Sequence, residues 1–490
     1  MTIPRVVIAA PGSGHGKTSV ATGLLGALRE SGLTVSPHKV GPDYIDPGYH
    51  ALAAGRPGRN LDAWLVGEDR IAGMFLHGAT TPVPADIAVI EGVMGLFDGK
   101  AGAAGQPAGD FASTAHVARL LGAPVVLVVD ASGMAASAAA LLHGFATFDP
   151  QVRLGGVIFN RAGSEYHEQL LRDAAGAAGV PVLGLIRRDS RLALPSRHLG
   201  LIPAAELGGA ARAAASALAA TVAAQVDLAE VVRLARSAGP LPAALPGQPE
   251  RDHPAAATPA GGRLARPRIA VAAGPAFTFG YAEHPELLAA AGAEVVSFDP
   301  LRDERLPDRT AALVIGGGFP EEHAVTLSAN ARLRAQVAAL ARAGAPVLAE
   351  CAGLLYLARS LDGHPMCGVL PVDAVMTGKL RCGYRDAVAV SASPLGPAGT
   401  RVHGHEFHRT AIQDPGSTAP GEAPAGDADR AWRWRASGAV VCEGFVRGRV
   451  HASYLHTHWT AIPGVAIRVT QAATEFAAAA IPETGPGRAR

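Results

Sequence analysis

The stretch "RVVIAAPGSGHGKTSV", residues 5–20, decides the fold of the first part of the chain. An apolar, β-branched run is followed by a glycine-rich loop and two polar residues: Gly12, Gly14, Gly16, Lys17 and Thr18. Because glycine tolerates backbone dihedrals that side chains forbid, such a loop can turn its N–H groups inward around an anion. A helix that opens at Lys17 adds a dipole that favours phosphate at the same place. The stretch therefore predicts a strand, a phosphate-binding loop and a helix.

The loop differs from the usual P-loop pattern G-x-x-x-x-G-K-[ST] at its first position, which Pro11 holds. In that pattern the lysine reaches the β- and γ-phosphates and the hydroxyl binds Mg²⁺. Residues 18–32 follow with helical spacing that ends at a glycine. An ordinary glycine-rich turn is the alternative, but such a turn rarely carries Gly-Lys-Thr in this register. We interpret the loop as a variant site for nucleotide phosphates.

The length and composition exclude several classes of protein. A chain of 490 residues is long enough for two or three domains. Its 43 basic and 42 acidic residues give a net charge of +1, so no strong field favours nucleic acid or an anionic membrane. Its four cysteines form no C-x-x-C pair, and its first residues lack the apolar core of a signal peptide. We expect a cytoplasmic protein with neither nucleic-acid nor membrane partners.

The chain shows two series of alternating strand and helix patterns. Short β-branched runs alternate with Ala/Leu-rich helical runs, first over 5–203 and again from 268. This order predicts an α/β fold, with a doubly wound parallel sheet around the P-loop and a second α/β domain. Proline, glycine and alanine break every periodicity between the two series. The expected parts are a first domain at 1–238, a linker at 239–267, a second domain at 268–465 and a C-terminal tail at 466–490. Within the second domain, we interpret 414–438 as a surface excursion.

Polar residues follow several strands of the first series. In open α/β sheets, ligands bind beyond the carboxyl ends of the strands. The residues at those places are Lys39, Asp43, Tyr44, Asp46, Glu91, Asp98, Asp130 and Asn160. Mg²⁺ prefers hard oxygen ligands together with phosphates, so Thr18 and one or two of the carboxylates form a sensible set of ligands. Turn formation is the alternative for Asp46, which stands in "DPG", and Asn160 either contacts a base or stabilises its loop.

The second series contains a candidate nucleophile in "VLAECAGLLYLA", residues 347–358. Cys351 lies there between a strand and a helix, which is the arrangement of a nucleophile elbow. We expect the helix N-terminus to lower the pKa of this thiol. An oxyanion hole is also required, and backbone N–H groups of Gly317, Gly318 and Ala352 are the candidates.

A general base for Cys351 is expected in "HASYLHTHW", residues 451–459, where His456 and His458 are the candidates. The run "HGHEFH" at 403–408 does not follow H-E-x-x-H spacing, so we expect no metal there.

Four long runs resemble the cobyrinate or hydrogenobyrinate a,c-diamide synthase family, the glutamine-dependent enzymes of corrin biosynthesis. They are "HKVGPDYIDPGYHALAAGRPGRNLDAWL" at 38–65, "VIEGVMGLFDG" at 89–99, "STAHVARLLGAPVVLVVDASGMAASAAAL" at 113–141 and "LPSRHLGL" at 194–201. The resemblance covers nearly the whole chain outside the linker and tail. It implies a dethiobiotin-synthetase-like first domain, in which the P-loop also departs from the strict pattern, and a class I, triad-type glutaminase domain.

The resemblance also implies roles for the candidate residues. The ATP site then contains Gly12, Gly14, Gly16, Lys17, Thr18 and Asn160. The Mg²⁺ ligands are Thr18, Glu91 and Asp46, and the substrate region contains Asp43, Tyr44 and Asp98. His456 becomes the catalytic histidine of the glutaminase, with Cys351. Residues 404–408 belong to the fold or to the interface between the active sites.

The implied reaction is amidation of the a and c acetate groups of a corrinoid through acyl phosphates, with ammonia from glutamine. A homodimer is the assembly we consider. A nickel-sirohydrochlorin a,c-diamide synthase, a partitioning P-loop ATPase and a scaffold with an inactive glutaminase are the alternatives.

Overall fold

The computed structural model describes residues 3–100, 109–189, 195–197, 200–241, 266–413, 429–436 and 438–479. The chain forms two compact units, Met1–Gln248 and Pro249–Arg490, and each is an α/β fold as predicted. Most of the expected linker at 239–267, and part of the motif at 194–201, lie outside the described residues. No helix within the described ranges is long and apolar enough to cross a membrane.

The first unit is built on a seven-stranded parallel sheet with the order β3-β2-β4-β1-β5-β6-β7. Its strands are β1 (Arg5–Ala9), β2 (Val35–Val40), β3 (Arg59–Leu61), β4 (Ile87–Glu91), β5 (Val125–Asp130), β6 (Leu154–Ala162) and β7 (Val182–Arg187). A two-stranded sheet, β8 (Ser196–Arg197) with β9 (Gly200–Leu201), stands apart from it. Every residue of β1, β2 and β4 is buried, which explains the apolar runs at 6–9 in β1 and 87–90 in β4.

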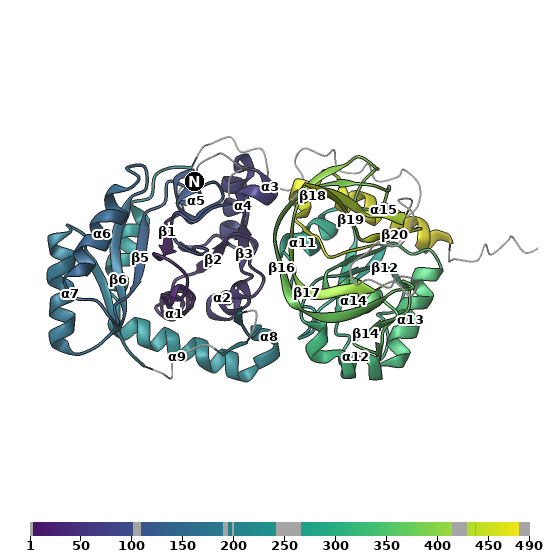
Figure 1. The fold of residues 1–490 in the computed structure, drawn as a ribbon, viewed down its shortest axis with the longest axis horizontal. Helices are drawn as coiled ribbons and strands as arrows, with labels where there is room; N and C mark the ends of the chain where they lie inside the picture. Colours follow the sequence, from purple (N-terminus) through teal and green to yellow (C-terminus); the bar gives the residue numbers. More distant parts are fainter. Residues whose placement is uncertain are drawn as a thin grey trace, which may run out of the picture. The chain divides into compact units, whose positions relative to one another are not determined.

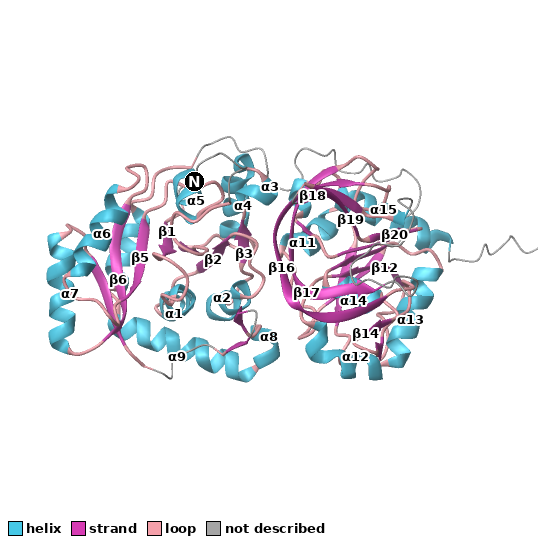
Figure 2. Ribbon diagram, in the orientation of Figure 1, coloured by secondary structure: helices cyan, strands magenta, loops and turns pink. Residues whose placement is uncertain are grey.

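Helices cover both faces of this sheet (Figures 1 and 2). They are α1 (Lys17–Glu30), α2 (Asp46–Ala54), α3 (Ala63–Val66), α4 (Glu68–Thr80), α5 (Thr114–Leu120), α6 (Ser137–Thr147), α7 (Glu165–Ala177), α8 (Ala204–Leu207), α9 (Gly209–Gln225) and α10 (Leu228–Arg236). The chain runs from β1 toward β2 on one side and later to β5 on the other. The sheet therefore has its switch point beside β1, where ligands bind in such folds.

Helix α1 packs closely against α9, and two glycines make this possible. A Cβ on Gly23 would lie 2.5 Å from Val222 Cγ2, and one on Gly26 would lie 2.7 Å from Ala219 Cβ. The close contact fixes α1, whose first turn carries Lys17 and Thr18.

The second unit contains two sheets. The first has the order β11-β10-β12-β13-β21-β20 and is parallel except for β20. Its strands are β10 (Arg268–Ala272), β11 (Glu294–Phe298), β12 (Thr310–Ile315), β13 (Val347–Glu350), β20 (Phe445–Arg447) and β21 (Val450–Ser453). The second sheet contains β14 (Ser360–Leu361), β15 (His364–Pro365), β16 (Asp373–Ala389), β17 (Arg401–Gln413), β18 (Trp432–Ala436), β19 (Ala439–Glu443) and β22 (His456–Thr457).

The helices of the second unit are α11 (Glu283–Ala290), α12 (Ala324–Ala329), α13 (Ala331–Arg342), α14 (Ala352–Leu357) and α15 (Val465–Ala479), with 3-10 turns at Pro320–His323 and Trp459–Ala461. The long strands β16 and β17 pair antiparallel, with His405 opposite Tyr384 on one side and opposite His456 of β22 on the other. This register brings the "HGHEFH" run beside the candidate catalytic histidine.

Two expectations about this unit were wrong. Residues 466–479 are not a tail, because α15 buries Val469 and Ala473 completely in the core and extends the unit to Ala479. The expected surface excursion at 414–438 contains β18, which pairs with β16 and β19 and buries Trp432 and Trp434. Residues 414–428 and 480–490 lie outside the described part of the chain.

Two candidate active sites

The phosphate-binding loop has the backbone that its glycines predict, with one exception. Gly14 and Gly16 have φ angles of 86° and 89°, in the left-handed region. A Cβ on Gly16 would also lie 2.2 Å from Asn160 Nδ2. Gly12 is not in that region, so the conformational argument does not hold for it. Its carbonyl instead accepts a long hydrogen bond of 3.4 Å from Lys17 Nζ, which also donates to the carbonyl of Met94 at 2.6 Å.

The three expected magnesium ligands lie together. Thr18 Oγ1, at the start of α1, donates to Glu91 Oε1 at 2.7 Å and lies 3.2 Å from Asp46 Oδ2. Glu91 ends β4 and Asp46 opens α2, so three separate elements supply the cluster. Among the described residues, no group of three or more His, Cys, Asp and Glu side chains is arranged to hold a metal.

Lys39 and His50 complete this cluster, although the sequence prediction gave neither a role. Lys39 Nζ lies 2.7 Å from Asp46 Oδ2 and 3.1 Å from Glu91 Oε1, and His50 Nε2 lies 2.7 Å from Glu91 Oε2. A lysine ending the buried strand β2 was the available signal, because a buried cation needs an anionic partner.

The pKa values of the two carboxyl groups in this cluster are shifted in opposite directions. Burial raises the pKa of Asp46 to about 7, with repulsion from Asp43 and Glu91 adding to the effect. Burial also acts to raise the pKa of Glu91, but Lys39 and His50 outweigh it and lower the value to about 2. Burial, followed by the charge of Lys39, lowers the pKa of Lys17. Glu91 is therefore the permanent anion of the site, and Asp46 is the group that titrates.

The three residues expected in the substrate region, Asp43, Tyr44 and Asp98, differ in burial and in hydrogen bonding. Asp43 Oδ1 accepts the backbone N–H groups of Ile45 and Asp46 at 2.9 and 3.0 Å, so it caps the start of α2. Asp98 is exposed and its Oδ2 accepts the N–H of Gly95 at 2.8 Å, which folds the loop after β4. Tyr44 is buried, with 8% of its surface exposed. Asp43 and Asp98 thus have structural hydrogen bonds, as the turn interpretation of such aspartates allows.

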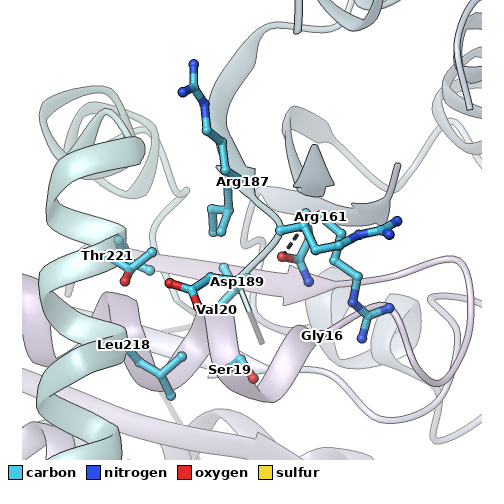
Figure 3. Close-up of a pocket in the computed structure, with 12 residues that line it drawn as sticks. Gly16, Ser19, Val20, Arg161, Arg187, Asp189, Leu218 and Thr221 are labelled. Carbon is cyan, nitrogen blue, oxygen red and sulfur yellow. Dashed lines mark hydrogen bonds between the residues drawn. The ribbon is translucent and has the colours of Figure 1, made fainter. Parts of the chain in front are cut away.

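A pocket of about 340 Å³ opens beside the N-terminus of α1 (Figure 3). Its walls come from α1, α9 and the ends of β6 and β7: Gly16, Ser19, Val20, Asn160, Arg161, Ile186, Arg187, Arg188, Asp189, Leu218, Thr221 and Val222. Asn160 donates from Nδ2 to the carbonyl of His15 at 2.9 Å and accepts the N–H of Arg161 at 3.0 Å. It therefore stabilises the loop, as one of its two interpretations requires, and also lines the pocket.

In the second unit, Cys351 has the strained backbone of a nucleophile elbow. Its φ and ψ angles are 50° and −102°, between the end of β13 and the start of α14. Backbone N–H groups of Gly318 and Ala352 donate toward its sulfur, and its own N–H donates to the carbonyl of Ser453 at 2.7 Å. The thiol thus sits beside two of the expected oxyanion-hole donors.

The pKa of Cys351 moves opposite to our expectation. Burial raises the pKa of this thiol well above its usual range, and the charge of Glu321 adds to the increase. The N–H groups of Ala352 and Gly318 act in the other direction but are outweighed. The resting nucleophile is therefore a thiol, which makes a nearby base essential.

Gly317 is not an oxyanion-hole donor in this structure, because its N–H donates to the carbonyl of Phe279 at 2.9 Å. The missing side chain of Gly317 instead leaves room for the ring of His456, the candidate base. A Cβ on Gly317 would lie 2.4 Å from His456 Cε1.

The two candidate histidines have different surroundings. His456 Nδ1 lies 3.9 Å from Oε2 of Glu350, the residue before Cys351, and its ring contacts the Gly317 turn. His458 Nε2 lies 3.6 Å from Glu283 Oε2, and its Nδ1 hydrogen-bonds to Thr460 Oγ1 at 2.8 Å. These contacts favour His456 as the base for Cys351.

Burial lowers the pKa of His456 to about 3, and nearby His405 and His408 add to the effect, so its imidazole is neutral at ordinary pH. Burial raises the pKa of Glu350 to about 7, against two hydrogen bonds from Thr457. Sequence reasoning missed Glu350. The signal was a carboxylate at the end of the strand that carries Cys351.

The "HGHEFH" run lies along this site. The carbonyl of Phe407 is 3.8 Å from Cys351 Sγ, which donates to it. His408 stacks on Tyr454 with ring centroids 3.7 Å apart, and Glu406 Oε2 pairs with Arg385 Nε at 2.5 Å. These residues form a wall around Cys351 and His456.

Comparison with known proteins divides the chain as the structure does. A model of the CobQ/CobB/MinD/ParA nucleotide binding domain matches residues 6–202, and a model of the CobB/CobQ-like glutamine amidotransferase domain matches 268–463. The hydrogenobyrinate a,c-diamide synthase of Streptomyces coelicolor is 58% identical over 96% of this chain and 97% of the relative. The chain belongs to the a,c-diamide synthase family.

Other members of the a,c-diamide synthase family are also similar to this chain over nearly its whole length. The hydrogenobyrinate a,c-diamide synthase of Mycobacterium tuberculosis H37Rv is 56% identical, over 96% of this chain and 97% of the relative. The cobyrinate a,c-diamide synthase of Syntrophotalea carbinolica is 44% identical, over 95% of this chain and 98% of the relative. The first unit is therefore the nucleotide-binding half of a family member, and the second unit is the glutamine amidotransferase half.

Proposed function

We propose that this enzyme uses ATP and glutamine to amidate the a and c acetate carboxylates of hydrogenobyrinic or cobyrinic acid, in cobalamin biosynthesis. The observation that carries the proposal is the presence of two complementary sites in one chain, the Thr18–Glu91 cluster and the Cys351 elbow. Relatives named for hydrogenobyrinate are 52–58% identical and those named for cobyrinate are 40–44% identical. This difference favours hydrogenobyrinic acid.

The first half-reaction activates a carboxylate. A carboxylate is a poor acyl donor, because hydroxide is a bad leaving group and the negative charge repels nucleophiles. Transfer of a phosphoryl group removes both obstacles. Lys17 stabilises the charge that develops on the transferred group, and the N–H groups of the loop orient the phosphates.

The residues at Thr18 suit a magnesium ion, since they offer a hydroxyl and two carboxylates with hard oxygen atoms. When bound, Mg²⁺ would neutralise charge on the phosphates. The low pKa of Glu91 keeps this carboxylate ionised and able to bind the ion. When no magnesium ion is bound, Lys39 neutralises Glu91 and Asp46.

The pocket beside α1 is the proposed site for the adenine base of ATP. Its volume of about 340 Å³ is within the range of small-ligand pockets, and Gly16 in its wall belongs to the phosphate-binding loop. Asn160 holds the loop and faces the base from the end of β6.

The second half-reaction supplies ammonia. Cys351 attacks the side-chain amide of glutamine while neutral His456 takes the thiol proton, and the N–H groups of Gly318 and Ala352 stabilise the oxyanion. The imidazolium of His456 returns the proton to the departing nitrogen, so ammonia leaves and a thioester remains, which water hydrolyses to glutamate and the free thiol. The ammonia then attacks the acyl phosphate, which forms the amide and releases phosphate. Glu350 stabilises the imidazolium form of His456 from the Nδ1 side and is the proposed third member of the triad.

We further propose that the enzyme acts in the cytoplasm, on a free corrinoid, without a nucleic-acid or membrane partner. Its near-zero net charge supports this. A homodimer stays a prediction that a mass measurement in solution checks.

The test is stoichiometric. The purified chain is incubated with ATP, Mg²⁺, glutamine and either hydrogenobyrinic or cobyrinic acid, and ADP, glutamate and product mass are measured together. One ADP and one glutamate per amide formed support the proposal. Glutamine hydrolysis and ATP hydrolysis with no change in the mass of either ring would overturn it.

A further inference from the structure

Beside the phosphate-transfer site lies a group of aromatic side chains, which we call the aromatic patch: the exposed Phe148 and the half-buried Phe97 and Phe145. Phe97 stacks on Phe145 with ring centroids 5.8 Å apart, and its centroid lies 4.6 Å from that of Phe148. Phe148 nevertheless keeps 73% of its surface exposed. An aromatic side chain left so open on a soluble protein is a candidate contact surface.

Helix α6, which carries Phe145 and ends next to Phe148, contributes few buried side chains to the core. Helix α6 buries only Ala138 and Leu142 of its eleven residues. No charged residue occurs from 131 to 148. A surface helix normally presents charged residues to water, so this composition indicates that an apolar ligand or partner covers α6.

The patch is continuous with the catalytic loop. Phe97 belongs to the loop after β4, whose Met94 carbonyl accepts the hydrogen bond from Lys17 Nζ at 2.6 Å. Met94 has a φ of 48°, a left-handed backbone that costs energy for a non-glycine residue, and 45% of its surface is exposed. In this backbone conformation the carbonyl of Met94 accepts the hydrogen bond from Lys17, while the Met94 side chain is exposed.

The two flanks of the phosphate-binding loop differ in chemistry. The pocket flank carries Arg161, Arg187 and Asp189 and suits the nucleotide. The flank formed by Met94 and the aromatic patch is mainly apolar, with the exposed Asp98 after Phe97 and the Arg119–Asp149 ion pair after Phe148 at its edge. A flat macrocycle has apolar faces and carries its carboxylates at the rim. Its binding therefore needs a polar site for one carboxylate and an apolar surface beside that site.

We propose that the aromatic patch and Met94 bind the apolar face of the tetrapyrrole substrate while one of its acetate groups lies at Lys17. This inference rests on the proposed function and names the surface that selects a macrocycle over a small carboxylic acid. It also explains why the apolar side chains lie on the loop that contacts the catalytic lysine.

The test compares Phe148→Ser and Phe97→Ala with Tyr166→Ser, a matched control on α7 whose side chain is 75% exposed. Binding of hydrogenobyrinic acid is measured directly by quenching of tryptophan fluorescence, and KM values for the corrinoid and for ATP are measured separately. We expect the Kd and KM for the corrinoid to rise about three- to tenfold in the two patch variants, as loss of one aromatic contact predicts. The KM for ATP should stay at the value of the control.

Three results would overturn the inference. One is corrinoid binding that is unchanged in both patch variants. Another is a change in particle mass by light scattering with unchanged corrinoid binding, which would assign the patch to a second copy of the chain. The third is a wild type that does not bind the ring. A wild type that binds the ring through the patch but does not amidate it would overturn the proposed function alone.

Discussion

His456 Nδ1 lies 3.9 Å from Glu350 Oε2, and Glu350 directly precedes Cys351 in the chain. This distance is too long for a hydrogen bond but short enough for charge stabilisation. The nucleophile and the group that supports its base thus come from adjacent positions of one strand end. The proposed triad therefore needs only one long-range contact, the one between Glu350 at the end of β13 and β22.

Replacing Glu350 by glutamine should slow glutamine hydrolysis by about 100-fold, because the imidazolium of His456 loses its stabilising charge. Amidation with ammonium salt should persist. Glu283→Gln is the matched control, since Glu283 stands in the same relation to His458. Equal losses in the two variants, or a larger loss in Glu283→Gln, would favour His458 instead.

The same carboxylate predicts a pH profile. Because burial raises the pKa of Glu350 to about 7, its charge appears only as pH rises through that value. The kcat/KM for glutamine hydrolysis should therefore increase with pH across neutrality, and Glu350→Gln should lack that increase. A profile with the same ascending limb in both proteins would contradict this role.

Gly317→Ala should disable the glutaminase by displacing His456, whose Cε1 would lie 2.4 Å from the new Cβ. Gly280→Ala is the control, because a Cβ at Gly280 meets no atom within 4 Å. We expect the first variant to lose at least about tenfold in glutaminase kcat, about 1.4 kcal/mol of barrier, and to keep ammonium-dependent amidation. Full glutaminase activity in Gly317→Ala would show that His456 tolerates the displacement or is not the base.

Magnesium affinity should depend on the protonation of Asp46. Burial raises its pKa to about 7, and a protonated carboxyl does not bind Mg²⁺ well. Affinity should therefore fall as pH drops below 7, and Asp46→Asn should have weak affinity at every pH. Titration of ATP-dependent activity with Mg²⁺ at several pH values measures this, and an affinity independent of pH in the wild type would exclude Asp46 as a ligand.

Removing Lys39 should destabilise the first unit. Lys39→Met leaves Glu91 and Asp46 buried without their cation, and breaking such a buried pair costs roughly 3–5 kcal/mol. Thermal unfolding of the variant should shift to lower temperature, and added Mg²⁺ with ATP should recover part of the loss. An unchanged melting temperature would mean that water already screens the cluster.

The sequence predicted those parts that depend on local pattern. The strand, glycine loop and helix at 5–30, and the strand, Cys351 and helix at 347–357, each lie within one short segment, so their geometry follows from residue types. Thr18, Asp46 and Glu91 could be grouped because parallel strands place their carboxyl ends at one edge of a sheet.

Other features depended on tertiary packing. The pKa of Cys351 follows its burial, which outweighs the local effect of the short helix α14. Gly317 could not be excluded as a donor until its pairing with Phe279 was seen. Helix α15 was missed because its alanine-rich pattern gains stability only from the core it covers.

The most direct test of the account compares the wild type with Cys351→Ala, both given ATP, Mg²⁺ and hydrogenobyrinic acid, with either glutamine or ammonium chloride. The account predicts that the wild type forms the diamide from either nitrogen source, whereas the variant forms it only from ammonium, as seen by product mass. Diamide formation from glutamine by Cys351→Ala would contradict the account, as would a variant that fails with ammonium while remaining folded.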